Sequence, residues 1–222
     1  MSEKTTFVSF LLDETGSMHG IKRDTIGGFN TYVETLQEGD ADILFSLVTF
    51  NSNETKRRYV AEPVREVAPL TADDYLPEAM TPLIDAAVKI IKATDEAVVH
   101  RGDDPNVVIV MQTDGEENVS VEYTNRDLAA LIKEKKAAGW EFVFLGAGLD
   151  AFEAARAAGI HLSADHVMSY SRSLSKGAFA LTAANVKDYA ELGDAERLSY
   201  RPGQRKRAGD KYTRKHLDLT NP

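Results

Sequence analysis

The sequence predicts an α/β fold in which helices cover both faces of a mostly parallel sheet. Short segments that are apolar throughout recur along the chain, and such segments are typical of strands buried on both faces. Helical patterns lie between them, and this alternation of strand and helix favours parallel pairing. The six expected strands span residues 6–12, 43–50, 54–60, 107–112, 141–145 and 166–170.

Bulk composition limits the classes of protein to which this chain can belong. Its 222 residues suffice for one well-buried domain. No apolar run reaches the roughly 18–20 residues that span a bilayer, and the polar first residues do not look like a signal peptide. The chain has no cysteine, which suits a reducing compartment, so we expect a cytoplasmic protein without membrane contact. Its net charge of −9 argues against a protein that coats nucleic acid.

The first helical pattern covers residues 18–37. Its apolar side chains recur at three- and four-residue spacing, which predicts one face packed on the sheet. Gly27 and Gly28 interrupt this pattern at a cost of about 1 kcal/mol each relative to alanine, and we expect close packing on the sheet to explain them. The apolar positions of this helix are Ile26, Phe29, Val33 and Leu36.

The next segments predict an edge strand, a loop and a helix. Residues 54–60 are charged, and charge on an exposed edge strand prevents pairing with other molecules. Residues 63–80 are expected to form a loop with a short helical piece. Thr81-Pro82 then opens a helix that runs to about Ala93, because proline fits the first helical position.

Three further helices are expected in the second half of the chain. The first spans residues 125–138. The second spans residues 150–158, and Asp150 and Glu153 provide a capping pair at its start. The last helix covers residues 172–192.

Residues 194–222 predict a polar, basic tail after a domain of residues 1–193. The tail has eight basic residues against four acidic ones, so it carries +4 and leaves −13 for the domain. Its low apolar content allows little burial, and we expect it to fold back on the acidic domain through sparse contacts. The alternative is an extension that binds a partner or nucleic acid.

Oxygen-bearing side chains occur where three segments are expected to meet. Asp13 ends the first strand and is followed by Thr15 and Ser17, Asp114 ends the fourth strand, and Thr81 starts the helix before it. If the strand order is the common 3-2-1-4-5-6, the first and fourth strands are neighbours, and ligands bind beyond their carboxyl ends. Two carboxylates and three hydroxyls suit a hard cation such as Mg²⁺, Mn²⁺ or Ca²⁺ rather than zinc or copper. We therefore predict that these five residues form a divalent-metal site.

Each of these residues also has a simpler interpretation. Ser17 and Thr81 are suitable N-caps for the helices that follow them. Asp114 and Gly115 are typical of a turn, and Asp13 fits an acid at a strand end. The expected convergence of all five ligands at one crevice favours the metal site.

Three motifs carry a family resemblance. The segment Asp13–Gly20, Asp-Glu-Thr-Gly-Ser-Met-His-Gly, resembles the Asp-x-Ser-x-Ser signature of von Willebrand factor A (vWA) domains, which have a metal-ion-dependent adhesion site (MIDAS). Thr81–Ala86 is similar to the second motif of that family, and Thr113–Glu116 to the third. The resemblance covers about residues 5–190 and points to intracellular bacterial or phage members. The one departure is Thr15 where serine is usual, and threonine keeps the hydroxyl.

The resemblance implies a fold and a way of holding the ion. The fold is a Rossmann-like, doubly wound, six-stranded sheet with one antiparallel edge strand, which the charged segment would supply. By this resemblance Thr15, Ser17 and Thr81 would contact the ion directly, whereas Asp13 and Asp114 would act mainly through water.

The resemblance also implies a function, that of a non-enzymatic, divalent-metal-dependent adaptor. An Asp or Glu of a protein partner would complete the coordination of the ion. Residues beside the ligands, Glu14, His19 and 116–118, would shape which partner fits. Nucleic acid is expected as a partner only through the basic tail, and the sequence leaves the oligomeric state open.

The main alternative is a Mg²⁺-dependent hydrolase or phosphatase-like enzyme that uses the same crevice. A haloacid-dehalogenase-type phosphatase needs a second aspartate two residues after Asp13, where Thr15 stands. A receiver domain needs a lysine after the fifth strand, where residues 146–148 read Gly-Ala-Gly. The sequence has no Walker loop and no obvious nucleophile or general base. A third interpretation is a vestigial site in a purely structural domain.

Overall fold

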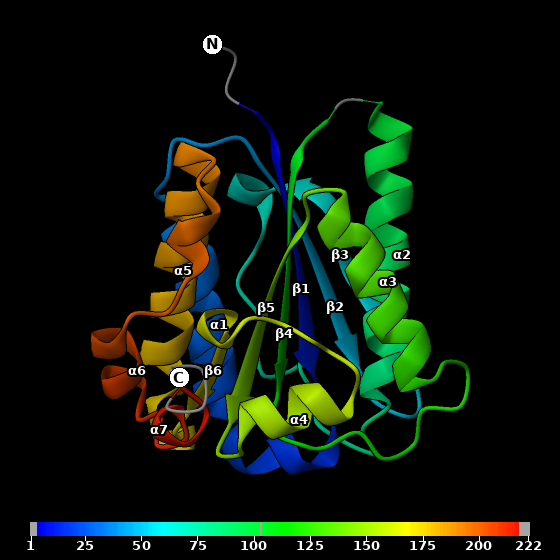
Figure 1. Cartoon of the computed structure of the whole chain (residues 1–222), viewed down its shortest axis with the longest axis vertical. Helices are drawn as coiled ribbons and strands as arrows, with labels where there is room; N and C mark the ends of the chain where they lie inside the picture. The colour runs from blue at the N-terminus through cyan, green and yellow to red at the C-terminus, as the bar shows by residue number, and fades with distance from the viewer. Residues whose placement is uncertain (1–3, 103, 218–222) are drawn as a thin grey trace.

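The computed structural model describes residues 4–102 and 104–217 and contains one six-stranded sheet (Figure 1). The strand order is β3-β2-β1-β4-β5-β6. Only β3 is antiparallel to its neighbour among these strands. The predicted fold class, strand order and antiparallel edge are therefore confirmed. The strands are β1 (Thr6–Asp13), β2 (Ile43–Phe50), β3 (Thr55–Pro63), β4 (Asn106–Thr113), β5 (Glu141–Ala147) and β6 (Val167–Tyr170).

The central position of β1 brings the ends of two distant segments together. All eight residues of β1 are buried, as expected for a strand with a parallel neighbour on each side and helices on both faces. Leu12 of β1 lies opposite Gln112 of β4, so Asp13 and Thr113, the last residues of the two strands, lie side by side. Loops after β1 and β4 consequently start from the same edge of the sheet.

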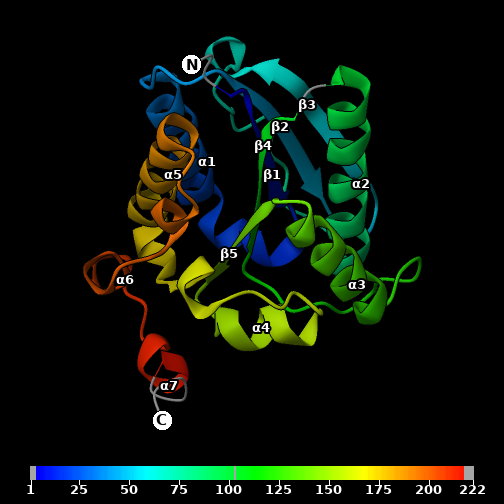
Figure 2. The same ribbon diagram turned by 45° about the horizontal axis from the view of Figure 1, so that its top comes forward.

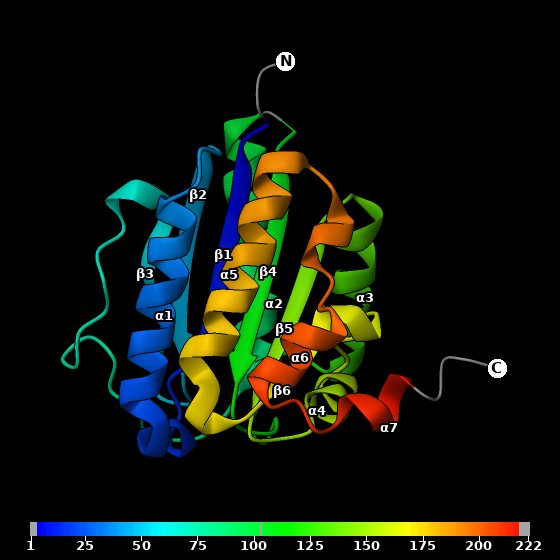
Figure 3. The same ribbon diagram turned by 90° about the vertical axis from the view of Figure 1, so that its left-hand side faces the viewer.

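Helices cover both faces of the sheet. On one face α1 and α5 pack against each other and against β1, as Figure 3 shows. On the other face α2, α3 and α4 bury their apolar sides, and Figure 2 separates the two layers. The α-helices are α1 (Lys22–Gln37), α2 (Leu83–Arg101), α3 (Asn125–Ala137), α4 (Ala151–Ala157), α5 (Ser175–Leu192), α6 (Pro202–Ala208) and α7 (Thr213–Leu217). None of the described helices is long and apolar enough to cross a membrane.

Short 3₁₀ turns precede two of the long helices and account for differences from the predicted boundaries. The helix expected from residue 18 begins as η1 (Gly16–Ile21) before α1, and the helix expected from residue 172 begins as η4 (Arg172–Leu174) before α5. The other 3₁₀ turns are η2 (Val64–Glu66), η3 (Ala164–His166) and η5 (Ala195–Leu198). Pro82 adopts φ −84° and ψ 61° and precedes α2 rather than starting it.

The glycine pair in α1 has a different explanation from the expected one. A Cβ on Gly28 would lie 3.0 Å from the ring of Phe179, which belongs to α5. A Cβ on Gly27 would meet nothing within 4 Å. Gly28 therefore allows the close approach of two helices, not of a helix and the sheet, and Gly27 has no packing role.

The segment after α5 packs on the body more closely than the sparse contacts expected of a polar tail. Leu198, Tyr200 and Ala208 are buried and join the core on the α1–α5 face. The Arg205 side chain is 2% exposed and donates hydrogen bonds to the backbone carbonyls of Ala164 and Val167, at 2.5 and 2.7 Å. The division at residue 193 stays a prediction. Residues 218–222 of the expected tail lie outside the described part of the chain.

Candidate metal centre

Three loops meet at the carboxyl edge of β1 and β4. The first starts at Asp13, the last residue of β1, and carries Thr15 and Ser17. The second ends at Thr81, just before α2, and the third follows β4 and carries Asp114. Hydrogen bonds connect these loops to one another, so their side chains converge on one place.

Asp13 is fully buried and its carboxylate is held from two sides. Its Oδ1 accepts the backbone N–H of Thr15 at 2.7 Å, and its Oδ2 accepts the hydroxyl of Thr113 at 2.5 Å. Burial raises the pKa of Asp13 to about 6, although these hydrogen bonds act in the opposite direction. The carboxylate therefore carries a negative charge that the protein does not compensate fully, and a bound cation would compensate it.

A chain of hydroxyls connects the first loop to Asp114. The Thr15 and Ser17 hydroxyl oxygens lie 3.1 Å apart, and the Ser17 hydroxyl donates to Oδ1 of Asp114 at 2.5 Å. The other oxygen of Asp114, Oδ2, accepts from the guanidinium of Arg172 at 2.9 Å. Burial raises the pKa of Asp114, and the Ser17 hydrogen bond and the charge of Arg172 oppose that rise.

Thr81 reaches the same place from the second loop. Its backbone is clamped by Asn118, which accepts the Thr81 N–H at 3.0 Å and donates its own N–H to the Thr81 carbonyl at 3.2 Å. The Thr81 and Ser17 hydroxyl oxygens lie 3.2 and 3.5 Å from the point that a Cβ on Gly115 would occupy. Both hydroxyls therefore border the same space beside Gly115, which a side chain there would crowd.

The simpler interpretations of the two hydroxyls as helix caps do not describe this structure. The N-cap position of η1 is Thr15, and that of α2 is Pro82; neither makes a side-chain capping bond. The Ser17 hydroxyl instead donates to Asp114, which lies in the loop after β4. Two carboxylates and three hydroxyls therefore share one edge of the sheet, and this set of hard oxygen donors fits a divalent cation.

Some of the residues beside the ligands differ from the expected rim. His19 and Glu116 are exposed, but Glu14 is 1% exposed, and its Oε1 accepts the backbone N–H of Leu76 at 2.5 Å. Glu117 turns inward, where its Oε2 accepts the backbone N–H of Ile84 at the start of α2, at 2.8 Å. Glu14 and Glu117 therefore stabilise loops and are not free to contact a partner.

Sequence reasoning missed the groups that hold the ligands in place. Thr113 holds Asp13, Asn118 clamps Thr81, and Arg172 pairs with Asp114. The Tyr75 hydroxyl also donates to the backbone carbonyl of Asp13. Thr113 is the first residue of the third motif and Asn118 lies two residues after its end, so attention to that motif and its flank could have found them. Arg172 and Tyr75 carry no signal in the sequence.

Comparisons with known proteins bear on the fold. The sequence matches no protein-family model, and no curated protein matches it. Solved structures do match. The proximal thread matrix protein 1 from the mussel byssus, with a zinc-occupied MIDAS motif, aligns over 86% of this chain at 15% identity and a TM-score of 0.57. A von Willebrand factor type A protein from Catenulispora acidiphila aligns over 88% at 13% identity and a TM-score of 0.55. This chain has the fold of a vWA domain.

A third vWA structure, the manganese-loaded Plasmodium vivax TRAP protein, aligns over 81% of this chain at 12% identity and a TM-score of 0.51. This chain spans 46% of the mussel protein, 43% of the Catenulispora protein and 75% of the TRAP structure. At identities this low, the structural likeness shows the vWA fold alone. The metals named for these proteins belong to their own sites.

A second group of possible metal ligands lies at the start of α4, beyond the carboxyl end of β5. Ligand atoms of Asp150, Glu153 and His216 lie within 4.8 Å of one another. The ammonium of Lys215 already contacts both carboxylates, and the His216 ring stacks on Phe152 with centroids 4.5 Å apart. Lys215 therefore offsets part of the negative charge of this cluster, and the contacts attach α7 to α4.

Proposed function

We propose that this chain is a non-enzymatic, divalent-metal-dependent protein-binding module. Asp13, Thr15, Ser17, Thr81 and Asp114 would hold the ion. The observation that carries this proposal is the bond from the Ser17 hydroxyl to Asp114, with the Thr81 hydroxyl facing the same space. It unites all three loops in one set of oxygen donors.

The chemistry of the donors supports Mg²⁺, Mn²⁺ or Ca²⁺ as the ion. All five groups are hard oxygen ligands, and none is a thiol or an imidazole. The zinc named for the mussel protein and the manganese named for the TRAP protein support a divalent ion at this edge of the fold. The vWA resemblance supports direct contact by the three hydroxyls and water-mediated contact by the two carboxylates.

A partner carboxylate would supply the remaining coordination. A bound divalent cation attracts a further anionic oxygen, because the interaction energy of opposite charges is large at contact distance and grows where water is partly excluded. The exposed side chains of His19 and Glu116 lie beside the ligands and would limit which partner fits. We therefore propose a protein that presents an Asp or Glu as the partner.

The same geometry does not favour a hydrolase. Asp13 is 0% exposed and Asp114 5% exposed, so neither carboxylate is presented to a substrate as a nucleophile. We include in the proposal a cytoplasmic location, which the cysteine-free sequence suits, and a basic extension of residues 194–222 attached to the binding domain.

Thermal melting in EDTA and in Mg²⁺, Mn²⁺ and Ca²⁺ series tests the ion site. Ligand at about 100 times its dissociation constant stabilises the folded state by roughly 2.7 kcal/mol, so a saturable rise in Tm is expected. Thr81→Ala should abolish the rise, because it removes one donor whose backbone position is fixed independently by Asn118. Thr213→Ala, on α7, is the matched control and should keep it. An equal rise in both variants would contradict the site.

A further inference from the structure

Seven of the basic residues lie in a short stretch near the end of the described chain. Residues 201–216 contain seven Lys or Arg and one acidic residue, Asp210, so they carry +6 and leave −15 for the rest of the chain. Such separation of charge creates a local positive field on an acidic molecule. In Figure 1 this stretch, α6 and α7, lies at the same end of the molecule as α4.

This stretch is fixed to the body rather than free in solution. The buried guanidinium of Arg205 donates to the backbone carbonyls of Ala164 and of Val167, the first residue of β6. The Asp150 carboxylate accepts from the His216 ring at 2.9 Å. The backbone that carries the other cations is therefore held in place, and a preorganised backbone lowers the loss of conformational entropy on binding.

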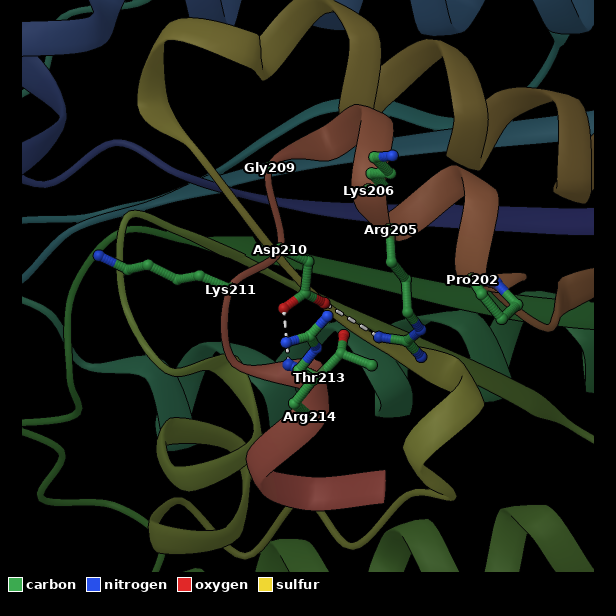
Figure 4. Close-up of a pocket in the computed structure, with 8 residues that line it drawn as sticks. All are labelled: Pro202, Arg205, Lys206, Gly209, Asp210, Lys211, Thr213 and Arg214. Carbon is green, nitrogen blue, oxygen red and sulfur yellow. Dashed lines mark hydrogen bonds and ion pairs between the residues drawn. The ribbon is translucent and has the colours of Figure 1, made fainter. Parts of the chain in front are cut away.

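The one acid of the stretch does not neutralise this surface. The Asp210 carboxylate is 0% exposed and pairs with Arg205 at 3.1 Å, an interaction that Figure 4 shows at the centre of a pocket. Its Oδ1 also accepts the backbone N–H groups of Tyr212 and Thr213, at 3.0 and 3.1 Å. Lys206, Lys211 and Arg214 are exposed, and none of them has a carboxylate at ion-pair distance among the described residues.

Two adjoining hollows extend from these cations to Arg172, which lies beside the metal centre. The larger, of about 690 Å³, is lined by Lys206, Lys211 and Arg214 (Figure 4). The smaller, of about 290 Å³, shares Lys211 with it and is lined also by Arg172, whose guanidinium contacts Asp114. We name Arg172, Lys206, Lys211 and Arg214 the basic strip.

We propose that the basic strip binds an acidic peptide segment of the same partner whose carboxylate completes the metal site. This inference rests on the proposed function and extends it. One carboxylate of the segment meets the ion, and further Asp or Glu side chains lie along Arg172, Lys211, Lys206 and Arg214. The partner is thus a protein with a run of acidic residues, not one with a single exposed carboxylate.

The distribution of charge favours a short acidic peptide over nucleic acid. A nucleic acid carries negative charge along its whole length, and where it ran past the strip it would meet a body with a net charge of −15. A peptide can confine its charges to the length of the strip. Rim charges of this kind act mainly on the association rate and on salt dependence.

Fluorescence anisotropy with a labelled oligo-glutamate peptide tests the strip. The test variant is Lys206→Glu/Lys211→Glu/Arg214→Glu, and Arg172 is left unchanged because it contacts Asp114. The matched control is Arg126→Glu/Lys133→Glu/Lys136→Glu, which changes net charge equally at exposed positions of α3 on the other face of the sheet. In Mg²⁺ the strip variant should bind at least about tenfold more weakly than the control, with a smaller salt dependence. The triple glutamine variant at the same three positions should have a peptide affinity between those of the strip variant and the control.

The ion site is measured separately on the same variants, by the Mn²⁺-dependent shift in Tm, which the strip variant should retain. If chelation abolishes peptide binding but the strip and control variants bind the peptide equally, the basic strip does not bind the peptide and the proposed function stands. If the strip variant loses binding that EDTA leaves untouched, the strip stands and the carboxylate–ion function fails. Absence of peptide binding at low ionic strength, or tighter binding of a thymidine oligonucleotide of the same length, overturns the strip as a peptide site.

Discussion

The guanidinium of Arg172 lies 2.9 Å from Oδ2 of Asp114. One of these groups is a proposed metal ligand, and the other is a cation whose side chain is 49% exposed. Gly148 makes room for this pair, because a Cβ there would lie 3.0 Å from Nε of Arg172. The structure therefore places a positive charge of the protein beside the position proposed for a divalent ion.

Arg172→Gln should strengthen ion binding, because it removes the like charge beside the ion. Arg172 can swing toward solvent when an ion binds, so the expected gain in affinity is modest, about threefold to tenfold at low ionic strength. A Mn²⁺ titration followed by Tm measures it, at a pH well above the raised pKa of Asp114. Arg126→Gln on α3 is the control and should leave the affinity unchanged. Weaker binding in Arg172→Gln would show that the arginine helps to build the site.

Asp13→Asn should abolish ion binding yet stabilise the metal-free protein. The pKa of Asp13 in the folded protein, about 6, is higher than the value of 3.8 for an unperturbed aspartate. Folding therefore favours the protonated form, and the ionised carboxylate costs stability above about pH 6. The asparagine carries no charge, so in EDTA above that pH we expect about 1–3 kcal/mol of extra stability.

The difference between Asp13→Asn and wild type should shrink as the pH falls through about 6. In that range the Asp13 carboxyl of the folded wild type becomes protonated, so its ionisation no longer lowers the stability of the wild type. Urea unfolding in EDTA across the pH series measures the free energy of unfolding of both proteins. Asp24→Asn, at an exposed position of α1, should not reproduce this pattern. If the difference in free energy of unfolding between Asp13→Asn and wild type is the same at every pH, Asp13 does not carry an uncompensated charge in the metal-free protein.

The fold and the meeting of three motifs were predictable from local patterns. The apolar runs end at Asp13 and at Thr113-Asp114, and parallel strands bring such ends to one edge. Arg172 was not predictable, because its contact with Asp114 depends on a 3₁₀ turn 58 residues later in the chain. The prediction that Glu14 contacts a partner was wrong for a similar reason. It becomes buried through the course of the loop that contains Leu76, and that loop has no periodic pattern.

Gly115→Ala should weaken ion binding without unfolding the domain. The added methyl would lie 3.2 Å from the Thr81 hydroxyl and 3.5 Å from the Ser17 hydroxyl, where it narrows the space that faces the ion. A decrease in Mn²⁺ affinity of about tenfold corresponds to roughly 1.4 kcal/mol, and calorimetric titration measures it. Gly27→Ala is the control, because its methyl meets nothing within 4 Å. It should keep the affinity and stabilise α1 by about 0.5–1 kcal/mol.

Gly159→Ala and Gly139→Ala separate backbone conformation from available space. Both glycines follow a helix, with φ of +85° and +86°, so alanine at either position incurs the left-handed penalty of about 1–2 kcal/mol. A Cβ on Gly139 meets nothing within 4 Å, whereas a Cβ on Gly159 would lie 2.1 Å from the carbonyl oxygen of Asn125, at the start of α3. Gly139→Ala should therefore cost only that penalty. Gly159→Ala should cost at least about 3 kcal/mol, because α4 must move away from α3. Urea unfolding of both variants measures the two costs, and equal losses would show that the contact with Asn125 relaxes freely.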